Sequence, residues 1–332
     1  GIGVAPGAQW IAARAFDNYG GAYDSWLHAG FEWLLAPGGN PAMAPDVINC
    51  SWGNDNGMLT IFQPDLQALN QAGIMVVVSN GNSGPNPRTV WSPASLPEAF
   101  AVGAVNSNDH VANFSSRGPS PWDEIRPHVA APGVSVVSSL PGGTYGSKNG
   151  TSMAAPHVTG LVALLRSVSP TLSITRATYI ITSTAMPLGN PIPNNNTGWG
   201  RVDALAAVSV LLQPGFISGT VSSAANGAPI AAAQIQATQR AGGGGGWTAT
   251  DSAGRYLQPL APSTYDVSVT AFGYQPAEAL GVSVLTDTTH TLDFSLSPLP
   301  AGTLYVTASD EENGQPVTAT LTISGTPLQA TA

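Results

Sequence analysis

The first two thirds of the chain alternate short apolar runs with helical patterns. Three short, predominantly apolar runs predict buried strands, at residues 47–50, 74–78 and 99–105. Between the first two runs, residues 62–72 place Leu66 and Leu69 on one face of a helix. Strands that alternate with helices at this spacing are typical of a parallel sheet with crossover helices, so the pattern predicts an α/β fold.

The pattern changes near residues 213–215, where the helical period disappears. Strands with alternating apolar positions follow, clearest at residues 265–269, and turns rich in Gly, Pro and Asn separate them. This arrangement predicts an antiparallel β-sandwich. The glycine run at residues 242–246 is compatible with a linker between domains, but its place between two strand candidates favours a loop within the sandwich.

A length of 332 residues fits about two domains. We expect one domain over residues 1–213 and a sandwich over residues 214–298. The motif Asn-Gly-Ala-Pro at 226–229 precedes an alternating strand, and Asn-Gly-Gln-Pro at 313–316 does the same near the end. Too few residues follow the second copy to close a sandwich, so residues 299–332 are interpreted as the start of a second, truncated repeat.

Composition narrows the class of protein. Only 9% of the residues are charged, against about 25% in an ordinary globular chain. Disordered polyelectrolytes and coiled coils need charge, so both are excluded. The net charge of −9 leaves no electrostatic footprint for nucleic acid, and no apolar run is long enough to cross a bilayer.

Cysteine and lysine usage indicate a compartment. Cys50 is the single cysteine, so the sequence predicts neither an intrachain disulfide nor a cysteine-based metal cluster. Lys148 is the single lysine. Few lysines together with abundant Gly, Ser, Thr and Asn favour a secreted bacterial protein. The sequence begins at Gly1 without a basic and apolar leader, so any targeting signal is expected to lie outside it.

The sharpest local signal is Gly-Thr-Ser-Met-Ala-Ala-Pro-His at residues 150–157, followed by the apolar pattern of a long buried helix. Ser152 falls at the start of that helix, where backbone N–H groups have no intrahelical partner and the helix dipole is positive. An oxyanion formed when this serine attacks a carbonyl would be stabilised there. A serine before a helix is also a common N-cap, so position alone does not separate the two roles.

The complete motif separates them. Gly-Thr-Ser-Met-Ala-x-Pro resembles the nucleophile signature of the subtilisin-like serine proteases, the peptidase S8 family. The resemblance covers about residues 1–212 and is strongest to the bacillopeptidase F branch. It implies a parallel sheet sandwiched between helices and a serine endopeptidase that forms an acyl-enzyme on Ser152. It also implies polypeptide substrates and no cofactor for the chemistry.

A second segment resembles the oxyanion site of that family. Residues 77–84 look like the strand that ends in Gly-Asn, whose asparagine donates to the oxyanion. Carried over to this sequence, the donor is Asn82. An asparagine in a glycine-rich turn is otherwise commonplace, so this role depends on the recognised nucleophile that follows.

A third segment, residues 48–53, resembles the family's substrate-binding strand. The resemblance implies that its end pairs by main chain with an extended peptide, as an added strand does. Together with residues 78–82 it would form the walls of the pocket for the residue that precedes the scissile bond. The implied substrate-binding residues are Ser51, Trp52, Gly53, Asn80 and Gly81.

Two motifs of the family are absent from this sequence. Its members carry an Asp in Asp-Thr-Gly or Asp-Ser-Gly and a His in His-Gly-Thr-His, both before the nucleophile, and neither motif occurs here. We expect both partners upstream of Gly1 in a longer protein, and this chain alone to be inactive. Five histidines are present and none is expected to substitute: His28, His110, His128, His157 and His290. Structural calcium is common in the family, but no Asp-rich loop specifies a site.

The second part resembles the carboxypeptidase regulatory-like domain, a small prealbumin-type sandwich. The resemblance rests on Asn-Gly-Ala-Pro at 226–229, Thr-Asp-Ser-Ala-Gly-Arg-Tyr at 250–256 and Tyr-Asp-Val at 265–267. Three tyrosines are expected to pack in or beside its core: Tyr256, Tyr265 and Tyr274.

Two other functions are weighed against a secreted endopeptidase. A non-catalytic peptide-binding or adhesion protein would keep the groove alone, and it would have no use for Ser152 or Asn82. A carbohydrate-binding protein is suggested only by fold analogy for the sandwich. The secreted endopeptidase is therefore the preferred function. We expect the protein to be a monomer and its partners to be polypeptide substrates.

Overall fold

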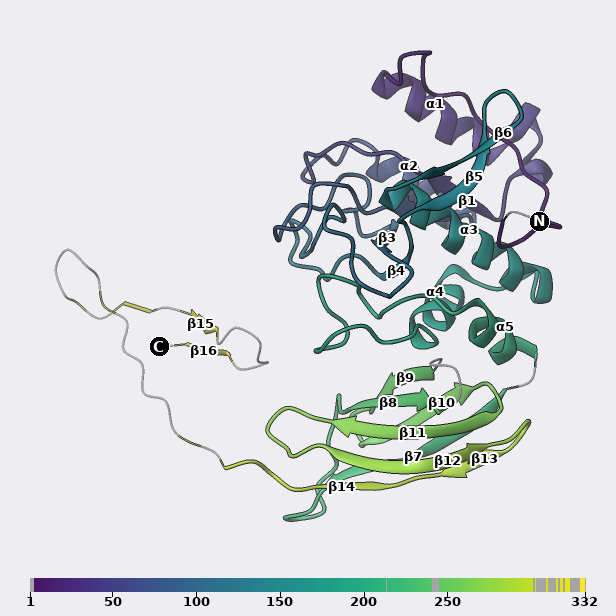
Figure 1. Ribbon diagram of the computed structural model, residues 1–332. Helices are drawn as coiled ribbons and strands as arrows, with labels where there is room; N and C mark the ends of the chain where they lie inside the picture. Colours follow the sequence, from purple (N-terminus) through teal and green to yellow (C-terminus); the bar gives the residue numbers. More distant parts are fainter. Residues whose placement is uncertain are drawn as a thin grey trace.

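The computed structural model describes residues 3–212, 214–240 and 245–300, and, beyond these, residues 302, 309, 315, 317, 318, 320–322 and 329–331. In the first part, four strands form one parallel sheet in the order β1-β2-β3-β4 (Figure 1). The strands are β1 (Val47–Cys50), β2 (Met75–Ser79), β3 (Phe100–Val105) and β4 (Val129–Pro132). The first three coincide closely with the apolar runs of the sequence, which confirms those predictions.

Helices and one hairpin surround this sheet in the described residues. The helices are α1 (Asp24–Leu35), α2 (Gln63–Gln71), α3 (Thr151–Val168), α4 (Ile174–Ser183) and α5 (Ala204–Leu212), with short 3₁₀ turns η1 (Pro37–Gly39) and η2 (Pro41–Met43). The predicted helix over residues 62–72 is α2. An antiparallel hairpin of β5 (Val136–Leu140) and β6 (Thr144–Lys148) precedes α3. The sequence did not predict it, because both strands are largely exposed.

Both faces of the parallel sheet are covered, which explains why its strands are predominantly apolar. Successive side chains of a strand point to opposite faces, so Met75 and Val77 join one hydrophobic cluster while Val76 and Val78 join another. The first cluster packs under α3, which contacts all four strands. The second lies beneath α1 and α2, and the two leucines predicted for the buried face of α2 are fully buried. The predicted α/β fold is confirmed.

The second part folds into two sheets, as predicted for a β-sandwich. One sheet has the order β10-β7-β13, with β14 also pairing with β7, and the other has the order β12-β11-β8-β9. The strands are β7 (Gly215–Ser223), β8 (Gln234–Gln239), β9 (Gly245–Ala249), β10 (Arg255–Leu260), β11 (Ser263–Thr270), β12 (Ala277–Val284), β13 (Thr289–Thr291) and β14 (Phe294–Leu296). The described pairs are antiparallel except for β13 and β14, which run parallel to β7.

Period-two burial builds the core of this sandwich. In β11, Tyr265, Val267 and Val269 are buried and alternate with less buried residues. Tyr256 also belongs to the core and Tyr274 packs against it, which confirms the expectation for the three tyrosines. Strands β8 and β9 are antiparallel neighbours, in agreement with a loop within the sandwich rather than an interdomain linker.

The predicted second repeat lies mostly outside the described residues. Its motif residues Asn313, Gly314 and Pro316 are among those that the structure does not describe. In the described residues of this region, β15 (Thr320–Thr322) pairs antiparallel with β16 (Gln329–Thr331). The second repeat therefore stays a prediction.

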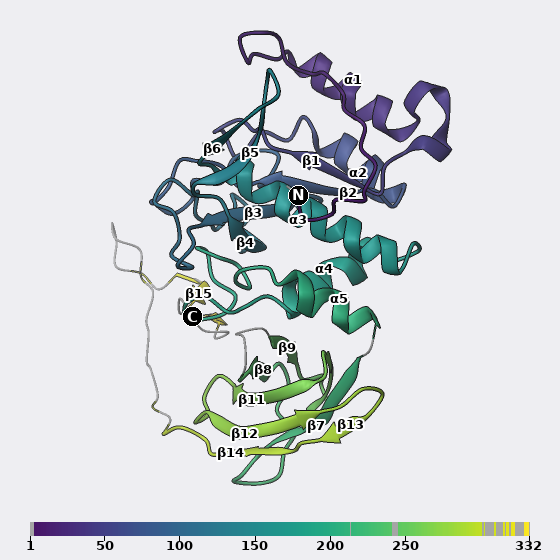
Figure 2. The same cartoon turned by 45° about the vertical axis from the view of Figure 1, so that its right-hand side comes forward.

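The sandwich is seated against α4 and α5, on the opposite side of the parallel sheet from α1 (Figures 1 and 2). Trp247 of β9 stacks on Trp199, with ring centroids 3.3 Å apart and ring planes inclined by 2°. The indole nitrogen of Trp247 donates to the backbone oxygen of Thr182, at the end of α4, over 2.9 Å. The two parts of the chain therefore share a packed interface.

Replacing Trp247 with alanine is expected to loosen this interface. The variant loses one aromatic stack and one hydrogen bond, which together contribute about 2 kcal/mol. Calorimetry should then show a lower melting temperature, with the sandwich melting apart from the α/β part. Trp10→Ala is the matched control because the Trp10 side chain is 84% exposed. An unchanged melting profile for Trp247→Ala would contradict the role given to the stack.

Candidate active site

The candidate active site lies where β1 and β2 end and α3 begins. Ser51 follows β1, Asn82 comes shortly after β2, and Ser152 belongs to the first turn of α3. The carboxyl ends of parallel strands share one edge of a sheet, where open α/β folds bind their ligands. Two reciprocal hydrogen bonds join the serines: Ser152 Oγ donates to the Ser51 backbone oxygen over 3.1 Å, and Ser51 Oγ donates to the Ser152 backbone oxygen over 2.8 Å.

The side-chain amide of Asn82 has a fixed orientation. Thr151 donates to Asn82 Oδ1 twice, from its backbone nitrogen over 2.9 Å and from Oγ1 over 3.0 Å. A backbone N–H can only donate, so the atom that faces it is the amide oxygen. Among the described residues, neither Asn82 Nδ2 nor the backbone N–H of Ser152 has an acceptor. Two N–H donors without an acceptor in the described residues therefore lie at the start of α3, one on Ser152 and one on the residue held by Thr151.

Ser51 is held by a chain of hydrogen bonds that starts in the middle of α3. Thr159 Oγ1 donates to Asn49 Oδ1 over 3.1 Å, and Asn49 Nδ2 donates to Ser51 Oγ over 2.8 Å. Asn49, Thr151 and Thr159 were not among the site residues predicted from the sequence. Thr151 belongs to the recognised motif, which was the available signal, but the contact between Thr159 and Asn49 joins residues 110 positions apart.

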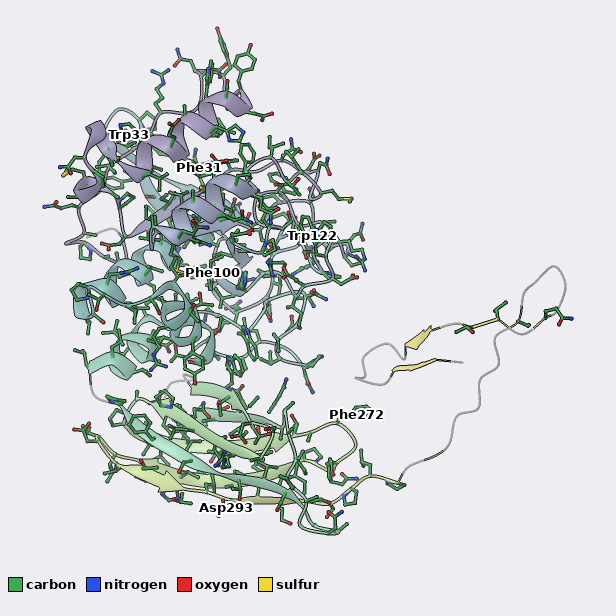
Figure 3. All side chains as sticks on the ribbon, turned by 180° about the vertical axis from the view of Figure 1, so that it is seen from behind. Phe31, Trp33, Phe100, Trp122, Phe272 and Asp293 are labelled. Atoms are coloured by element: carbon green, nitrogen blue, oxygen red, sulfur yellow. The ribbon has the colours of Figure 1, made fainter. Side chains whose placement is uncertain are left out.

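The side chain of Trp52 faces the hydrophobic core. Its ring packs against Phe31 of α1, with centroids 5.9 Å apart, and against Phe62 at 5.4 Å. Figure 3 shows Phe31 beneath the helix that carries it. The Trp52 ring is therefore engaged with aromatic side chains of the core, and the main-chain binding predicted for this segment stays a prediction.

Asn80 and Gly81 form the loop behind Asn82. The Asn80 side chain is fully buried, and its Nδ2 donates to the backbone oxygen of Ser116 over 2.8 Å. Its Oδ1 has no partner within the described residues. The Gly81 backbone nitrogen donates to Thr151 Oγ1 over 3.3 Å, so the same threonine anchors both Gly81 and Asn82. The backbone of Asn80 is paired as well, because its nitrogen donates to the Val102 oxygen over 3.0 Å and its oxygen accepts from Trp91 N over 3.1 Å.

Residues 1–200 match the family model of the subtilases, peptidase family S8. The chain belongs to the subtilase family. Residues 216–297 match the carboxypeptidase regulatory-like domain, so both resemblances seen in the sequence are confirmed.

Three curated relatives show how much of a subtilase the chain matches. Bacillopeptidase F of Bacillus subtilis is 46% identical over 224 residues, which cover 63% of this chain and 16% of that protein. Subtilisin E of Bacillus subtilis is 42% identical over 191 residues, 57% of this chain and 47% of that protein. M-protease of Shouchella clausii is 37% identical over 206 residues, 62% and 50% respectively. The chain thus spans half or less of the length of each relative.

None of the five histidines of this subtilase hydrogen-bonds to Ser152 in the part of the chain that the structure describes. His28 Nδ1 on α1 pairs with Asp65 Oδ2 on α2 over 2.8 Å. His157 Nδ1 lies 2.9 Å from the Met153 backbone oxygen, one helical turn earlier in α3. Both imidazoles are occupied by contacts within or between helices.

Cys50, the last residue of β1, does not compete with Ser152 as a nucleophile. Its thiol is buried, and burial raises its pKa to about 12. The thiolate is the reactive form of cysteine, so the protonated thiol is inert at neutral pH. Ser152 therefore remains the candidate nucleophile at this edge of the sheet.

The described residues contain neither a cluster of metal-ligating side chains nor a membrane-spanning helix. No group of three His, Cys, Asp or Glu side chains is placed to hold a metal ion. No helix combines the length and apolar character needed to cross a membrane.

Proposed function

We propose that this chain is the body of a secreted serine endopeptidase that hydrolyses peptide bonds in polypeptides. One observation carries the proposal. Thr151, the residue directly before Ser152, holds the Asn82 amide by two hydrogen bonds. Ser152 Oγ is hydrogen-bonded to Ser51, directly after β1. A nucleophile beside two free N–H donors is suited to attack on a carbonyl. The family match of residues 1–200 supports the same reaction.

In the proposed reaction, Ser152 Oγ attacks the carbonyl carbon of the scissile bond and gives its proton to a base. The carbonyl oxygen becomes an oxyanion that accepts hydrogen bonds from Asn82 Nδ2 and the Ser152 N–H. When the intermediate collapses, the C–N bond breaks, the leaving amine takes up the proton, and an ester on Ser152 remains. Water then hydrolyses this ester and restores the serine.

An extended peptide would bind by main chain along residues 51–53, with Asn80 and Gly81 on the other side of the residue that precedes the scissile bond. The engagement of the Trp52 ring in the core supports main-chain recognition along residues 51–53.

The base of the proposed reaction is a histidine oriented by an aspartate, both upstream of Gly1. The lack of either family motif in the sequence supports this placement. We further propose that the protein is a monomer. Its domains would span residues 1–213, 214–298 and 299–332. The end of α5 at Leu212 and the start of β7 at Gly215 support the first boundary.

The test compares casein hydrolysis by this chain and by the full gene product, including the residues that precede Gly1. The full product should cleave casein and should be labelled by a fluorophosphonate at Ser152, located by peptide mass spectrometry. The chain alone should do neither, because loss of the histidine alone costs subtilisin, a member of this family, about 10⁶-fold in kcat. A folded full product that neither cleaves nor reacts would overturn the proposal and favour a peptide-binding scaffold.

A further inference from the structure

The indole of Trp91 lies between the two segments that would form the walls of the substrate pocket. A methyl group built on Gly81 would stand 2.5 Å from Trp91 Cγ and 2.6 Å from its Cδ1. A methyl group built on Gly53 would stand 3.3 Å from both Cβ and Cε3 of the same tryptophan. Both glycines are therefore in direct contact with the indole, one against its five-membered ring and the other against its six-membered ring.

The main chain of residues 91 and 92 bridges the same two segments. Trp91 N donates to the backbone oxygen of Asn80 over 3.1 Å, on the side of β2. Ser92 and Asn54 exchange two backbone hydrogen bonds, of 2.9 Å and 2.8 Å, on the side of β1. The backbone that carries the indole is thus tied to both walls.

The ring itself is also fixed. Trp91 Nε1 donates to Ser83 Oγ over 2.8 Å, directly after Asn82 in the chain. A side chain held by a hydrogen bond at its far end and by backbone on both sides cannot swing out without losing these contacts. The residue is half-buried, so one part of the indole still faces solvent.

We propose that Trp91 fills the pocket for the residue that precedes the scissile bond and restricts that residue to small side chains such as alanine. This inference rests on the proposed endopeptidase function. The planar indole occupies the space between Gly53 and Gly81. An aromatic side chain of the substrate would otherwise insert into this space. The two glycines make room for the tryptophan, so the space is used by the protein rather than left for the substrate.

The first test uses the full gene product and two peptide p-nitroanilides, succinyl-Ala-Ala-Pro-Ala and succinyl-Ala-Ala-Pro-Phe. The wild type should favour the alanine substrate in kcat/KM by at least about 10-fold, since pockets discriminate by this order for small differences in size. Trp91→Gly should shift the ratio toward phenylalanine by at least about 10-fold, and Trp91→Leu should shift it less. A wild type that prefers phenylalanine, or a ratio unchanged in Trp91→Gly, would overturn the inference.

The matched control is Trp122→Ala, which removes a tryptophan that is 42% exposed and lies at the margin of the α/β part (Figure 3). It should leave the substrate ratio unchanged. Circular dichroism of each variant shows whether it is folded.

A second measurement separates the inference from the proposed function. Calorimetric titration of the peptides Ala-Ala-Pro-Ala and Ala-Ala-Pro-Phe into this chain needs no catalysis. The alanine peptide should bind more tightly to the wild type, and Trp91→Gly should improve the relative affinity of the phenylalanine peptide at least about 10-fold. If the full product hydrolyses nothing, the proposed function fails and this series still decides on Trp91. Equal or absent binding of both peptides to wild type and variant contradicts a pocket filled by Trp91.

Discussion

Replacement of Ser152 with alanine is expected to lower kcat of the full gene product about 10⁶-fold, the loss found for the nucleophilic serine of subtilisin. No other group in the described site is placed to form the acyl-enzyme. The Cys50 thiol is buried and protonated, and the Ser51 hydroxyl is tied between Asn49 and the Ser152 backbone. The two proposed oxyanion donors survive the substitution, so the residual rate should still exceed that of the uncatalysed reaction. The measurement is steady-state hydrolysis of a peptide p-nitroanilide.

The pattern of kcat and KM distinguishes chemistry from damage to the fold. Ser152→Ala removes one hydrogen bond, to the Ser51 backbone oxygen, worth about 1 kcal/mol, so the variant should stay folded with KM nearly unchanged. Ser167→Ala, on the exposed face of the same helix, is the control and should keep full activity. Retention of more than about a tenth of the activity by Ser152→Ala would mean that another group is the nucleophile.

The parallel sheet could be predicted from the sequence because its strands are buried on both faces. Residues such as Met75 and Val76 point to opposite sides, yet each meets a hydrophobic cluster, so the run is apolar throughout. The β5–β6 hairpin gave no such signal, since its residues are largely exposed. The Trp199–Trp247 stack could not be predicted either, because the sequence around each tryptophan does not show which residue it contacts.

The site could be predicted only as far as its local motif reached. Ser152 and Asn82 were found because each belongs to a recognisable segment, whereas the fixed orientation of the Asn82 amide depends on Thr151 in another part of the chain. The position of Trp91 could not be inferred, because it depends on the missing side chains of Gly53 and Gly81. A glycine in a sequence indicates that a side chain is missing. Only the fold shows which neighbouring residue occupies the space that this leaves.

Lowering the pH from 7 to 4 is expected to destabilise the folded protein by about 3 kcal/mol through His128 alone. Burial, together with the nearby positive charge of Arg126, lowers the pKa of this imidazole from 6.5 to about 3. Its ring stacks on Phe100 with planes inclined by 14°, and its Nδ1 accepts a hydrogen bond from the Ala101 nitrogen over 3.0 Å. Protonation of Nδ1 would place a donor against that N–H.

The sign of the effect follows from the two pKa values. The unfolded chain takes up a proton near pH 6.5, whereas the folded chain does so only near pH 3. The stabilisation is therefore fully present above pH 6.5 and is lost progressively as the pH falls toward 3, at about 1.4 kcal/mol per pH unit.

His128→Asn isolates this contribution, because asparagine Oδ1 can accept the hydrogen bond from Ala101 N and does not titrate. The free energy of unfolding, measured by urea titration between pH 6 and pH 4, should fall less steeply in His128→Asn than in the wild type, by about 1.4 kcal/mol per pH unit. His110→Asn, at an exposed position, controls for the loss of an imidazole as such. Equal slopes for the wild type and His128→Asn would show that acid destabilises this protein through other groups, such as the carboxylates of its ion pairs.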